Sequence, residues 1–353
     1  MAGRNNNGVR VVRLNTTLFP VKPFEEDLYR RYGLDPHRCE ANTPDELIAQ
    51  LADCDALFVI STTLSREVVQ SLTKCRLISR IGTGTDKIDV EEATKMGIIV
   101  SNVPEFSVAD MADHSMGMLL SLSRKLPLMD RMMRAGQFTP ARRETVAIIR
   151  PELSVLGLIG FGASAKAVAR RARPFGLRIL ATRRNMSDRA EADALGVELV
   201  GLAELLHQSD YVSLHLPLTR ESYHLLNEET IASMKPGACL INTSRGALVD
   251  ELALAAALRS GHLAGAGIDT FEDIDIFTED ESPPDHPLID LDNVILSPHV
   301  GGLSAKATEV VSLTGVENLV SVVRGHLPAP ANIVNQQVEP RFPLAPHDSS
   351  LFA

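Results

Sequence analysis

The sequence predicts an α/β protein with two doubly wound parallel sheets, and three observations lead to this prediction. Short apolar runs alternate with helical segments over residues 9–122, and a second alternating series begins near residue 154. A glycine-rich turn stands between a strand and a helix at the start of the second series, as in dinucleotide-binding folds. A chain of 353 residues also suits two domains. Two Rossmann-like domains in succession are therefore expected.

The first series contains four predicted strands, at Val9–Leu14, Leu57–Ile60, Leu77–Ile81 and Ile98–Val100. Pro44–Ala52 precedes the second of them and is helix-like. A long helix is expected over Ser107–Leu122, where Met111, Met118, Leu119 and Leu122 form an apolar stripe.

The second series contains six predicted strands, at Val155–Ile159, Arg178–Ala181, Tyr211–Leu214, Cys239–Asn242, Gly265–Ile268 and Val294–Leu296. Helical segments separate most of them, which is typical of a doubly wound dinucleotide fold. Lys306–Val323 is expected to be a closing helix, and the proline-rich tail Pro328–Ala353 is expected to be loosely ordered.

Composition excludes several classes of function. The net charge of −10, the absence of Trp and the 4% aromatic content disfavour a nucleic-acid-binding protein. No run of 18 apolar residues is long enough for a membrane span. The four cysteines form no metal-binding motif and are expected to be buried, and no apolar signal core follows the polar start of the chain. A cytoplasmic protein without a bound metal is expected.

The turn after the first strand of the second series has the pattern GxGxxA, and its residues are Gly160, Phe161, Gly162, Ala163, Ser164 and Ala165. Gly160 permits a tight turn, Gly162 lets the backbone approach a pyrophosphate, and the small Ala165 allows close contact between helix and strand. The helix N-terminus supplies free N–H groups to the phosphates. The alternative is an ordinary glycine-rich turn, but the strand and helix on either side favour a cofactor site.

Two arginines follow the next strand, where NAD-binding folds usually carry an acid that holds the ribose 2′-hydroxyl. Arg183 and Arg184 stand there instead. Guanidinium groups can pair with a 2′-phosphate, which predicts NADP(H) in preference to NAD(H). Alternatively, both side chains end the strand in solvent.

A series of motifs between Leu57 and Asn335 resembles the D-2-hydroxyacid dehydrogenases, which include glyoxylate/hydroxypyruvate reductases and phosphoglycerate dehydrogenases. Besides the Gly160 turn, the matching segments are Gly82–Asp89, Asn102–Pro104, Ala112–His114, His215–Thr219, Met234–Gly237, Ile241–Gly246, Gly267–Asp269 and Ser297–His299. Each segment alone is modest evidence, whereas their order and spacing together are specific.

The resemblance implies a dinucleotide domain inserted into a substrate domain. The NAD(P)-binding domain is expected over residues 108–300, and the substrate domain over 1–107 and 301–353. The family also implies a homodimer formed largely through the dinucleotide domains, and a small 2-oxo or 2-hydroxy acid as substrate.

Hydride transfer to a 2-oxo acid needs a cation for the carboxylate and a proton donor for the developing alkoxide. Arg245 follows a predicted strand and is the expected cation, because a guanidinium can clamp a carboxylate through two hydrogen bonds. His299 follows another predicted strand and is the expected acid/base, since an imidazole exchanges protons near neutral pH. A surface charge and a structural histidine are the competing interpretations.

The remaining site residues follow from the family pattern. Ser61, Thr83 and Gly84 are expected to bind substrate, and His215, Pro217, Thr243, Asp269 and Gly301 to lie at the nicotinamide end of the cofactor. Ile60 is apolar and offers no cation for a phosphate, which disfavours a phosphorylated substrate.

The acid that partners the histidine is where the sequence departs from the family. The family places a Glu five residues after the position of Asp269, where this chain has Ile274. An insertion of about seven residues within 272–280 would make Glu281 the acid, with Glu272 as runner-up and Asp275 also possible. A carboxylate bonded to His299 would fix its tautomer and raise its pKa. Alternatively, the acids near Glu281 are all solvated.

Two other functions remain open on the sequence. A nucleotide-binding transcriptional co-regulator could use the same fold, and a relative could act on formate or phosphite instead of a 2-oxo acid. Assays with NADPH and a panel of substrates separate these possibilities from a reductase.

Overall fold

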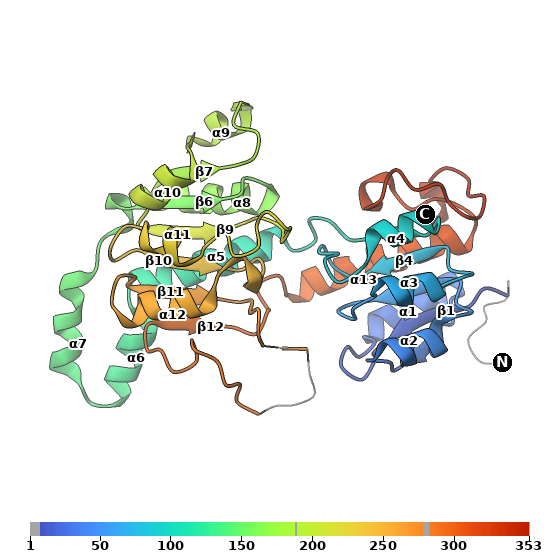
Figure 1. Ribbon diagram of the computed structural model, residues 1–353, viewed down its shortest axis with the longest axis horizontal. Coiled ribbons are helices and arrows are strands. Elements are labelled where there is room, and N and C mark those ends of the chain that lie inside the picture. Colours follow the sequence, from blue (N-terminus) through green and yellow to red (C-terminus); the bar gives the residue numbers. More distant parts are fainter. Residues whose placement is uncertain (1–7, 188, 275, 278–281, 353) are drawn as a thin grey trace. The chain divides into compact units, whose positions relative to one another are not determined.

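The computed structural model describes residues 8–187, 189–274, 276–277 and 282–352 and divides the chain into two compact units (Figure 1). The N-terminal unit comprises residues 1–106 and 304–353, and the central unit comprises residues 107–303. The chain therefore leaves the first unit, builds the second, and returns.

The N-terminal unit is built on a five-stranded parallel sheet with strand order β2-β1-β3-β4-β5. Its strands are β1 (Val11–Leu14), β2 (His37–Cys39), β3 (Ala56–Val59), β4 (Leu77–Arg80) and β5 (Ile99–Ser101). Four of them lie where apolar runs predicted strands. The strand order reverses between β1 and β3, so the carboxyl ends of these strands border a topological switch point.

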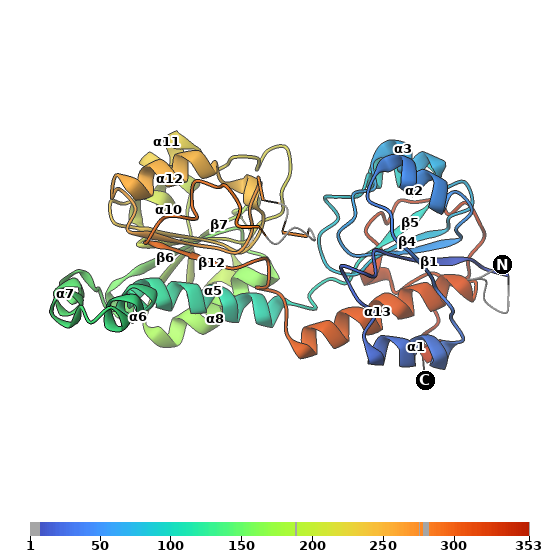
Figure 2. The ribbon, with the colours of Figure 1, turned by 90° about the horizontal axis from the view of Figure 1, so that it is seen from below.

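Helices cover both faces of this sheet (Figure 2). They are α1 (Pro23–Tyr32), α2 (Pro44–Leu51), α3 (Arg66–Ser71), α4 (Val90–Lys95) and α13 (Ala305–Val323). Helices α1 and α13 pack on one face, and α2, α3 and α4 on the other. The start of α2 is fixed locally, because the Thr43 side chain accepts a hydrogen bond from the N–H of Glu46 and the Glu46 carboxylate bonds back to Thr43.

The C-terminal tail is ordered against the N-terminal unit, so the expectation of a loose tail is wrong. Asn335 is 1% exposed, and its side chain bonds Val100 N–H, the Ile98 carbonyl and the Thr94 hydroxyl. The Arg341 guanidinium donates to backbone carbonyls, including that of Met96. Proline content predicts a lack of regular secondary structure, but these polar anchors hold an irregular segment in one place.

The central unit is built on a seven-stranded parallel sheet with strand order β12-β11-β10-β9-β6-β7-β8. Its strands are β6 (Val155–Ile159), β7 (Arg178–Thr182), β8 (Val197–Leu199), β9 (Tyr211–Leu214), β10 (Cys239–Asn242), β11 (Gly265–Ile268) and β12 (Val294–Leu296). The six predicted strands are present. This order is that of the doubly wound dinucleotide fold, and its switch point lies between β6 and β9.

Helices again lie on both faces of the central sheet (Figure 2). One face carries α5 (Val108–Ser123) and α8 (Ala163–Ala172), and the other carries α10 (Leu202–Gln208), α11 (Glu228–Ala232) and α12 (Glu251–Arg259). The short helix α9 (Ala190–Leu195) leads into β8. After α5 the chain forms α6 (Leu126–Arg134) and α7 (Phe138–Glu144), in which no residue is buried. Within the described residues, no helix has both the length and the apolarity to cross a bilayer.

Candidate active site

Most of the predicted site residues in the central unit lie in turns at the carboxyl end of its sheet. The Gly160 turn follows β6, His215 follows β9, Arg245 follows β10, Asp269 follows β11 and His299 follows β12. Because all seven strands are parallel, these turns leave the same edge of the sheet. Ligands of open α/β sheets bind at this edge.

The Gly160 turn has the geometry that a dinucleotide needs. Gly160 has φ +93°, and a Cβ there would lie 2.2 Å from the His215 carbonyl oxygen, so only glycine fits. A Cβ at Gly162 would meet nothing within 4 Å, which leaves the backbone open to an approaching group. Gly162 is the N-cap of α8 and no side chain caps this helix, so the first N–H groups face the turn without a side-chain partner. These features fit a pyrophosphate.

His215 is buried beside this turn, and its Nε2 forms a 2.9 Å hydrogen bond with the Ser213 hydroxyl. Its Nδ1 atom has no partner among the described residues, as expected of a group that faces a ligand. Burial lowers the pKa of His215 to about 4, so this imidazole is neutral at neutral pH. His215 is therefore a poor proton donor. Pro217, two residues later, is exposed.

Arg183 follows the last residue of β7, whose Thr182 carbonyl accepts a hydrogen bond from the Gly160 N–H. This bond ties the carboxyl end of β7 to the glycine-rich turn. The charge of Arg183 also reaches Glu191 on α9, whose pKa is lowered by its hydrogen bond with Lys166 and, more weakly, by Arg183. Arg184 is exposed next to it. The edge expected to face the adenosine ribose is thus cationic, with Glu191 as a nearby acid.

The turn that carries Arg245 is braced from within. The Asn242 amide donates to the Arg245 carbonyl at 2.8 Å, and its oxygen accepts from Ser244 N–H at 3.1 Å. Thr243 is buried and bonds Ser115 of α5 at 2.9 Å. A Cβ at Gly246 would lie 1.9 Å from the Phe271 carbonyl carbon, so this turn packs directly on the chain that follows β11. These contacts fix the backbone from which the half-buried Arg245 side chain projects.

The turn that carries His299 is fixed by Asp269. The Asp269 carboxylate is fully buried and accepts hydrogen bonds from the Ser297 hydroxyl at 2.5 Å, Val300 N–H at 3.0 Å and Gly301 N–H at 2.9 Å. His299 N–H donates to the Asp269 carbonyl at 2.8 Å. His299 itself has φ +55°, a conformation that L residues adopt at a cost of about 1–3 kcal/mol. The bonds to Asp269 hold this strained turn.

Sequence reasoning missed His114 and Ser297, which complete this network. His114 Nε2 lies 2.9 Å from the Ser297 hydroxyl and 3.5 Å from Asp269 Oδ1. Burial would raise the pKa of Asp269, but the hydrogen bonds from His114, Ser297 and the backbone outweigh it and lower that pKa. Asp269 is therefore ionised at neutral pH. The matching segments 112–114 and 297–299 contained both residues, but nothing in the sequence pairs them.

The three acids named as candidates in place of Ile274 have different outcomes. Glu272 Oε2 lies 2.6 Å from His224 Nε2, and Glu272 also bonds Tyr223, so its carboxylate is engaged on that side. Glu281 lies outside the described residues, as does Asp275. The centroids of the Phe277 and His299 rings are 5.5 Å apart, so the chain at Phe277 lies beside the imidazole.

The predicted substrate residues of the N-terminal unit lie at the carboxyl ends of β3 and β4. Gly82 (φ +143°) opens the turn after β4, and the Thr83 hydroxyl donates to the Val103 carbonyl at 3.1 Å. Gly84 accepts a bond from the Arg80 guanidinium at 2.9 Å. Lys87 Nζ bonds the Ser61 hydroxyl at 3.2 Å, so a cation does stand beside Ser61. The apolar Ile60 predicts no cation here, because the cation comes from Lys87, 26 residues after Ser61 in the sequence.

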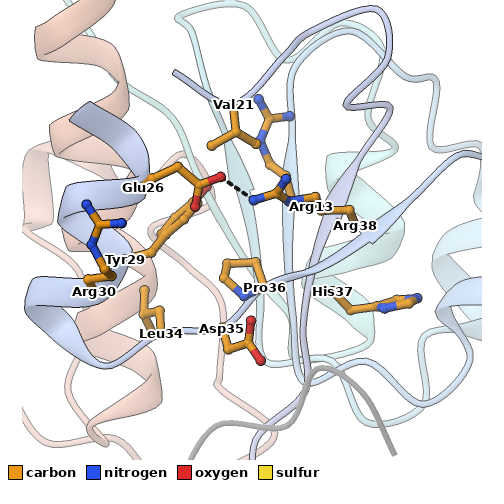
Figure 3. A pocket seen from close by; sticks show the side chains of 10 residues that line it. All are labelled: Arg13, Val21, Glu26, Tyr29, Arg30, Leu34, Asp35, Pro36, His37 and Arg38. Carbon is orange, nitrogen blue, oxygen red and sulfur yellow. Dashed lines mark hydrogen bonds and ion pairs between the residues drawn. The ribbon is translucent and has the colours of Figure 1, made fainter. Parts of the chain in front are cut away.

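A separate cavity of about 480 Å³ lies between α1 and β2 of the N-terminal unit (Figure 3). Tyr29 and Arg30 line one side and His37 and Arg38 the other, with an ion pair between Arg38 and Glu26. Its described lining residues include none of the predicted site residues. The described residues also contain no group of three His, Cys, Asp or Glu side chains that could hold a metal ion.

Comparison with known proteins decides the family. The model of the D-isomer specific 2-hydroxyacid dehydrogenase NAD-binding domain matches residues 116–301. The glyoxylate reductase of Korarchaeum cryptofilum is 40% identical over 294 residues, which cover 83% of this chain and 86% of that protein. The chain belongs to the D-isomer specific 2-hydroxyacid dehydrogenases. The resemblance stated from the motifs is confirmed.

Solved structures of this dehydrogenase family share the fold. The D-lactate dehydrogenase of Aquifex aeolicus, complexed with NAD and lactic acid, is 28% identical with a TM-score of 0.81, covering 92% of this chain and 99% of that one. An acyclic imino acid reductase in complex with NADPH and D-Arg is 27% identical with a TM-score of 0.76, covering 92% and 98%. The present dehydrogenase thus uses a nicotinamide cofactor and transfers a hydride between it and a 2-oxo or D-2-hydroxy acid.

Proposed function

We propose that this dehydrogenase reduces short, unphosphorylated 2-oxo acids such as glyoxylate, with Arg245 and His299 as its catalytic residues. The observation that supports this most strongly is the placement of both turns at the sheet edge that carries the Gly160 turn. Asp269, which follows the strand between them, braces the His299 turn. The cation, the acid/base and the dinucleotide turn are thus supported by one rigid sheet.

The proposed roles follow from the chemistry of these side chains. Bound nicotinamide supplies the hydride that reduces C2 of the substrate. The Arg245 guanidinium binds the substrate carboxylate and stabilises the negative charge that develops on the adjacent oxygen. The His299 imidazolium donates its proton to that oxygen, which becomes the hydroxyl of the product. In the opposite direction, neutral His299 removes the proton.

The remaining residues are proposed to bind and orient. The backbone from Gly160 to Ser164 would hold the pyrophosphate, and the unpartnered Nδ1 of His215, with Pro217 and Thr243, would lie near the nicotinamide. Asp269 and Gly301 would hold the nicotinamide end through the turn that they fix. In the N-terminal unit, Ser61, Thr83 and Gly84 are proposed substrate contacts.

A panel of 2-oxo acids tests the proposed substrate class. Steady-state rates with glyoxylate, hydroxypyruvate, phenylpyruvate and a phosphorylated 2-oxo acid are measured by the loss of reduced nicotinamide absorbance. We expect glyoxylate or hydroxypyruvate to give the highest kcat/KM. A clear preference for the phosphorylated acid would contradict the proposal and would point to Lys87, the cation beside Ser61, as a phosphate ligand.

Cofactor preference is predicted to favour NADP(H), because Arg183 would pair with the 2′-phosphate. Replacing Arg183 with serine should raise KM for NADPH about tenfold or more and leave KM for NADH within about twofold, a loss of one charged hydrogen-bonding group. The matched control is Arg178→Ser, at the opposite end of the same strand, where Arg178 pairs with Glu198. Wild-type preference for NADH, or equal effects of the two substitutions, would refute the assignment.

The partner of His299 is proposed to be Glu281, because the carboxylate of Glu272 is already bonded to His224. Without its acid, His299 loses its proton at lower pH. Reduction needs protonated His299, so Glu281→Gln should lower kcat and move the upper limb of the pH profile to lower pH. Glu272→Gln is the matched control and should leave that limb in place. An unchanged limb in Glu281→Gln would remove Glu281 from the site.

A homodimer is proposed through the exposed apolar surface of α6, α7 and the chain after them. Met133 is 63% exposed, Phe138 50% and Val146 91%. Exposed apolar side chains grouped within one segment of a dehydrogenase unit are typical of an interface. A cytoplasmic location stays a prediction from the sequence.

A further inference from the structure

Two cysteines of the N-terminal unit face each other at the start of neighbouring strands. In the β3–β4 register Ala56 pairs with Leu77, and Arg76 N–H bonds the Asp55 carbonyl at 2.8 Å just before it. Cys54 and Cys75 stand one residue before Asp55 and Arg76. The register of the two strands therefore places the two cysteines opposite each other just before the paired residues begin.

The side chains of the two cysteines lie in the same part of the apolar core. Both are fully buried and belong to the apolar core between the sheet and α2, α3 and α4. The Cys54 thiol hydrogen-bonds to Cys75, and this bond together with burial raises the pKa of Cys54. The Cys75 thiol in turn donates to the Leu77 carbonyl at 3.3 Å.

The spacing suits a disulfide. Neighbouring strands lie about 4.8 Å apart, and disulfides join residues whose Cα atoms are about 4.4–6.8 Å apart. Both cysteines precede their strands, in short connections that can adjust more easily than the sheet itself. We propose that Cys54 and Cys75 form a disulfide when the protein meets a small-molecule disulfide such as oxidised glutathione.

The reaction balances as two thiol–disulfide exchanges. One protein thiolate attacks a sulfur of the small disulfide, which forms a mixed disulfide and releases one small thiolate that takes up the proton. The second protein thiolate then attacks the protein sulfur of the mixed disulfide and expels the other small thiolate. The two protein thiols lose two electrons, and the small disulfide is reduced to two thiols.

Burial controls when this modification takes place. Both thiols are buried out of reach of a small disulfide, so the reaction requires local opening or takes place during folding. Once formed, the bond closes a loop of about 20 residues that includes β3 and α3, which should restrict the unfolded chain. The oxidised form is therefore expected to be the more stable one.

The test oxidises the full chain with oxidised glutathione in mild, non-denaturing urea, and alkylates the remaining thiols in denaturant. Cleavage after Glu46 separates Cys39 from Cys54, so mass spectrometry of the digest identifies the partners. We expect two of the four cysteines to escape alkylation and a peptide linking Cys54 to Cys75. The oxidised form should unfold roughly 5–10 °C higher than the reduced form.

Two alanine variants make the result specific. Cys39 lies in the same core cluster but is not part of the proposed pair, so Cys39→Ala should still form the Cys54–Cys75 disulfide. In Cys54→Ala the remaining Cys75 lacks its proposed partner, so its reaction should stop at the mixed disulfide with glutathione. The wild-type digest decides the matter even if a variant folds poorly. Three results would overturn the proposal: full alkylation of Cys54 and Cys75 at the highest concentration of oxidised glutathione, a disulfide that includes Cys39, or a lower unfolding temperature after oxidation.

Discussion

Replacing His299 with asparagine is expected to lower kcat for 2-oxo acid reduction by roughly 10²–10⁴-fold. Asparagine keeps a polar side chain and tolerates the left-handed backbone, where His299 has φ +55°. The turn should therefore keep its conformation, because its hydrogen bonds to Asp269 come from the backbone of residues 299–301 and from the Ser297 hydroxyl. Only the proposed proton donor is lost. Steady-state kinetics with NADPH and glyoxylate measure the effect.

The control for this variant is His207→Asn, an exposed residue of α10, which should leave kcat unchanged. The affinity of the His299 variant for NADPH, measured by fluorescence titration, should stay within about threefold of wild type, since the dinucleotide turn is untouched. Retention of wild-type kcat would exclude His299 as the acid. His114, which contacts Ser297 and Asp269, would then be the alternative acid, because His215 is buried and uncharged at neutral pH.

Replacing Arg245 with lysine is expected to lower kcat/KM by roughly 100-fold although the charge is kept. A lysine cannot form the two parallel hydrogen bonds that a guanidinium gives to a carboxylate. The substrate would be held less firmly in the reactive orientation, and small displacements of a reacting group cost about this much in rate. The loss should be in both kcat and KM, because the weaker ion pair raises KM and the poorer orientation of the bound substrate lowers kcat.

Arg259→Lys is the matched control, because Arg259 ends α12 and its guanidinium bonds only a backbone carbonyl among the contacts described. It should have wild-type kinetics. Circular dichroism and the thermal unfolding temperature check that both variants are folded. An Arg245→Lys enzyme with unchanged kcat/KM for its best substrate would remove Arg245 from the site.

The sequence predicted the central sheet well because each of its longer strands is a buried apolar run. It missed β2 and β8, which are edge strands of three residues with a charged middle residue, Arg38 in β2 and Glu198 in β8, so neither contains an apolar run. It also misjudged the tail. Asn335 and Arg341 hold the tail through hydrogen bonds to residues more than 200 positions away in the sequence, and no local sequence pattern predicts such contacts.

The candidate site was predictable to the extent that its residues follow strands. The positions of Gly160, Arg245, Asp269 and His299 at one sheet edge follow from parallel topology alone. The partners of Asp269 do not, because Ser297 and His114 reach it from separate elements. The partner acid of His299 does not follow from the sequence, since this chain has Ile274 where the family pattern places a glutamate.

Transfer of an isotopic label tests the central claim most directly. NADPH that carries deuterium as the transferred hydride is incubated with the full chain and hydroxypyruvate, and the 2-hydroxy acid product is examined by mass spectrometry, NMR and chiral chromatography. The proposed reaction predicts one deuterium, bonded to C2, in a product of D configuration. Product without deuterium at C2, product of L configuration, or consumption of NADPH without a 2-hydroxy acid would contradict it.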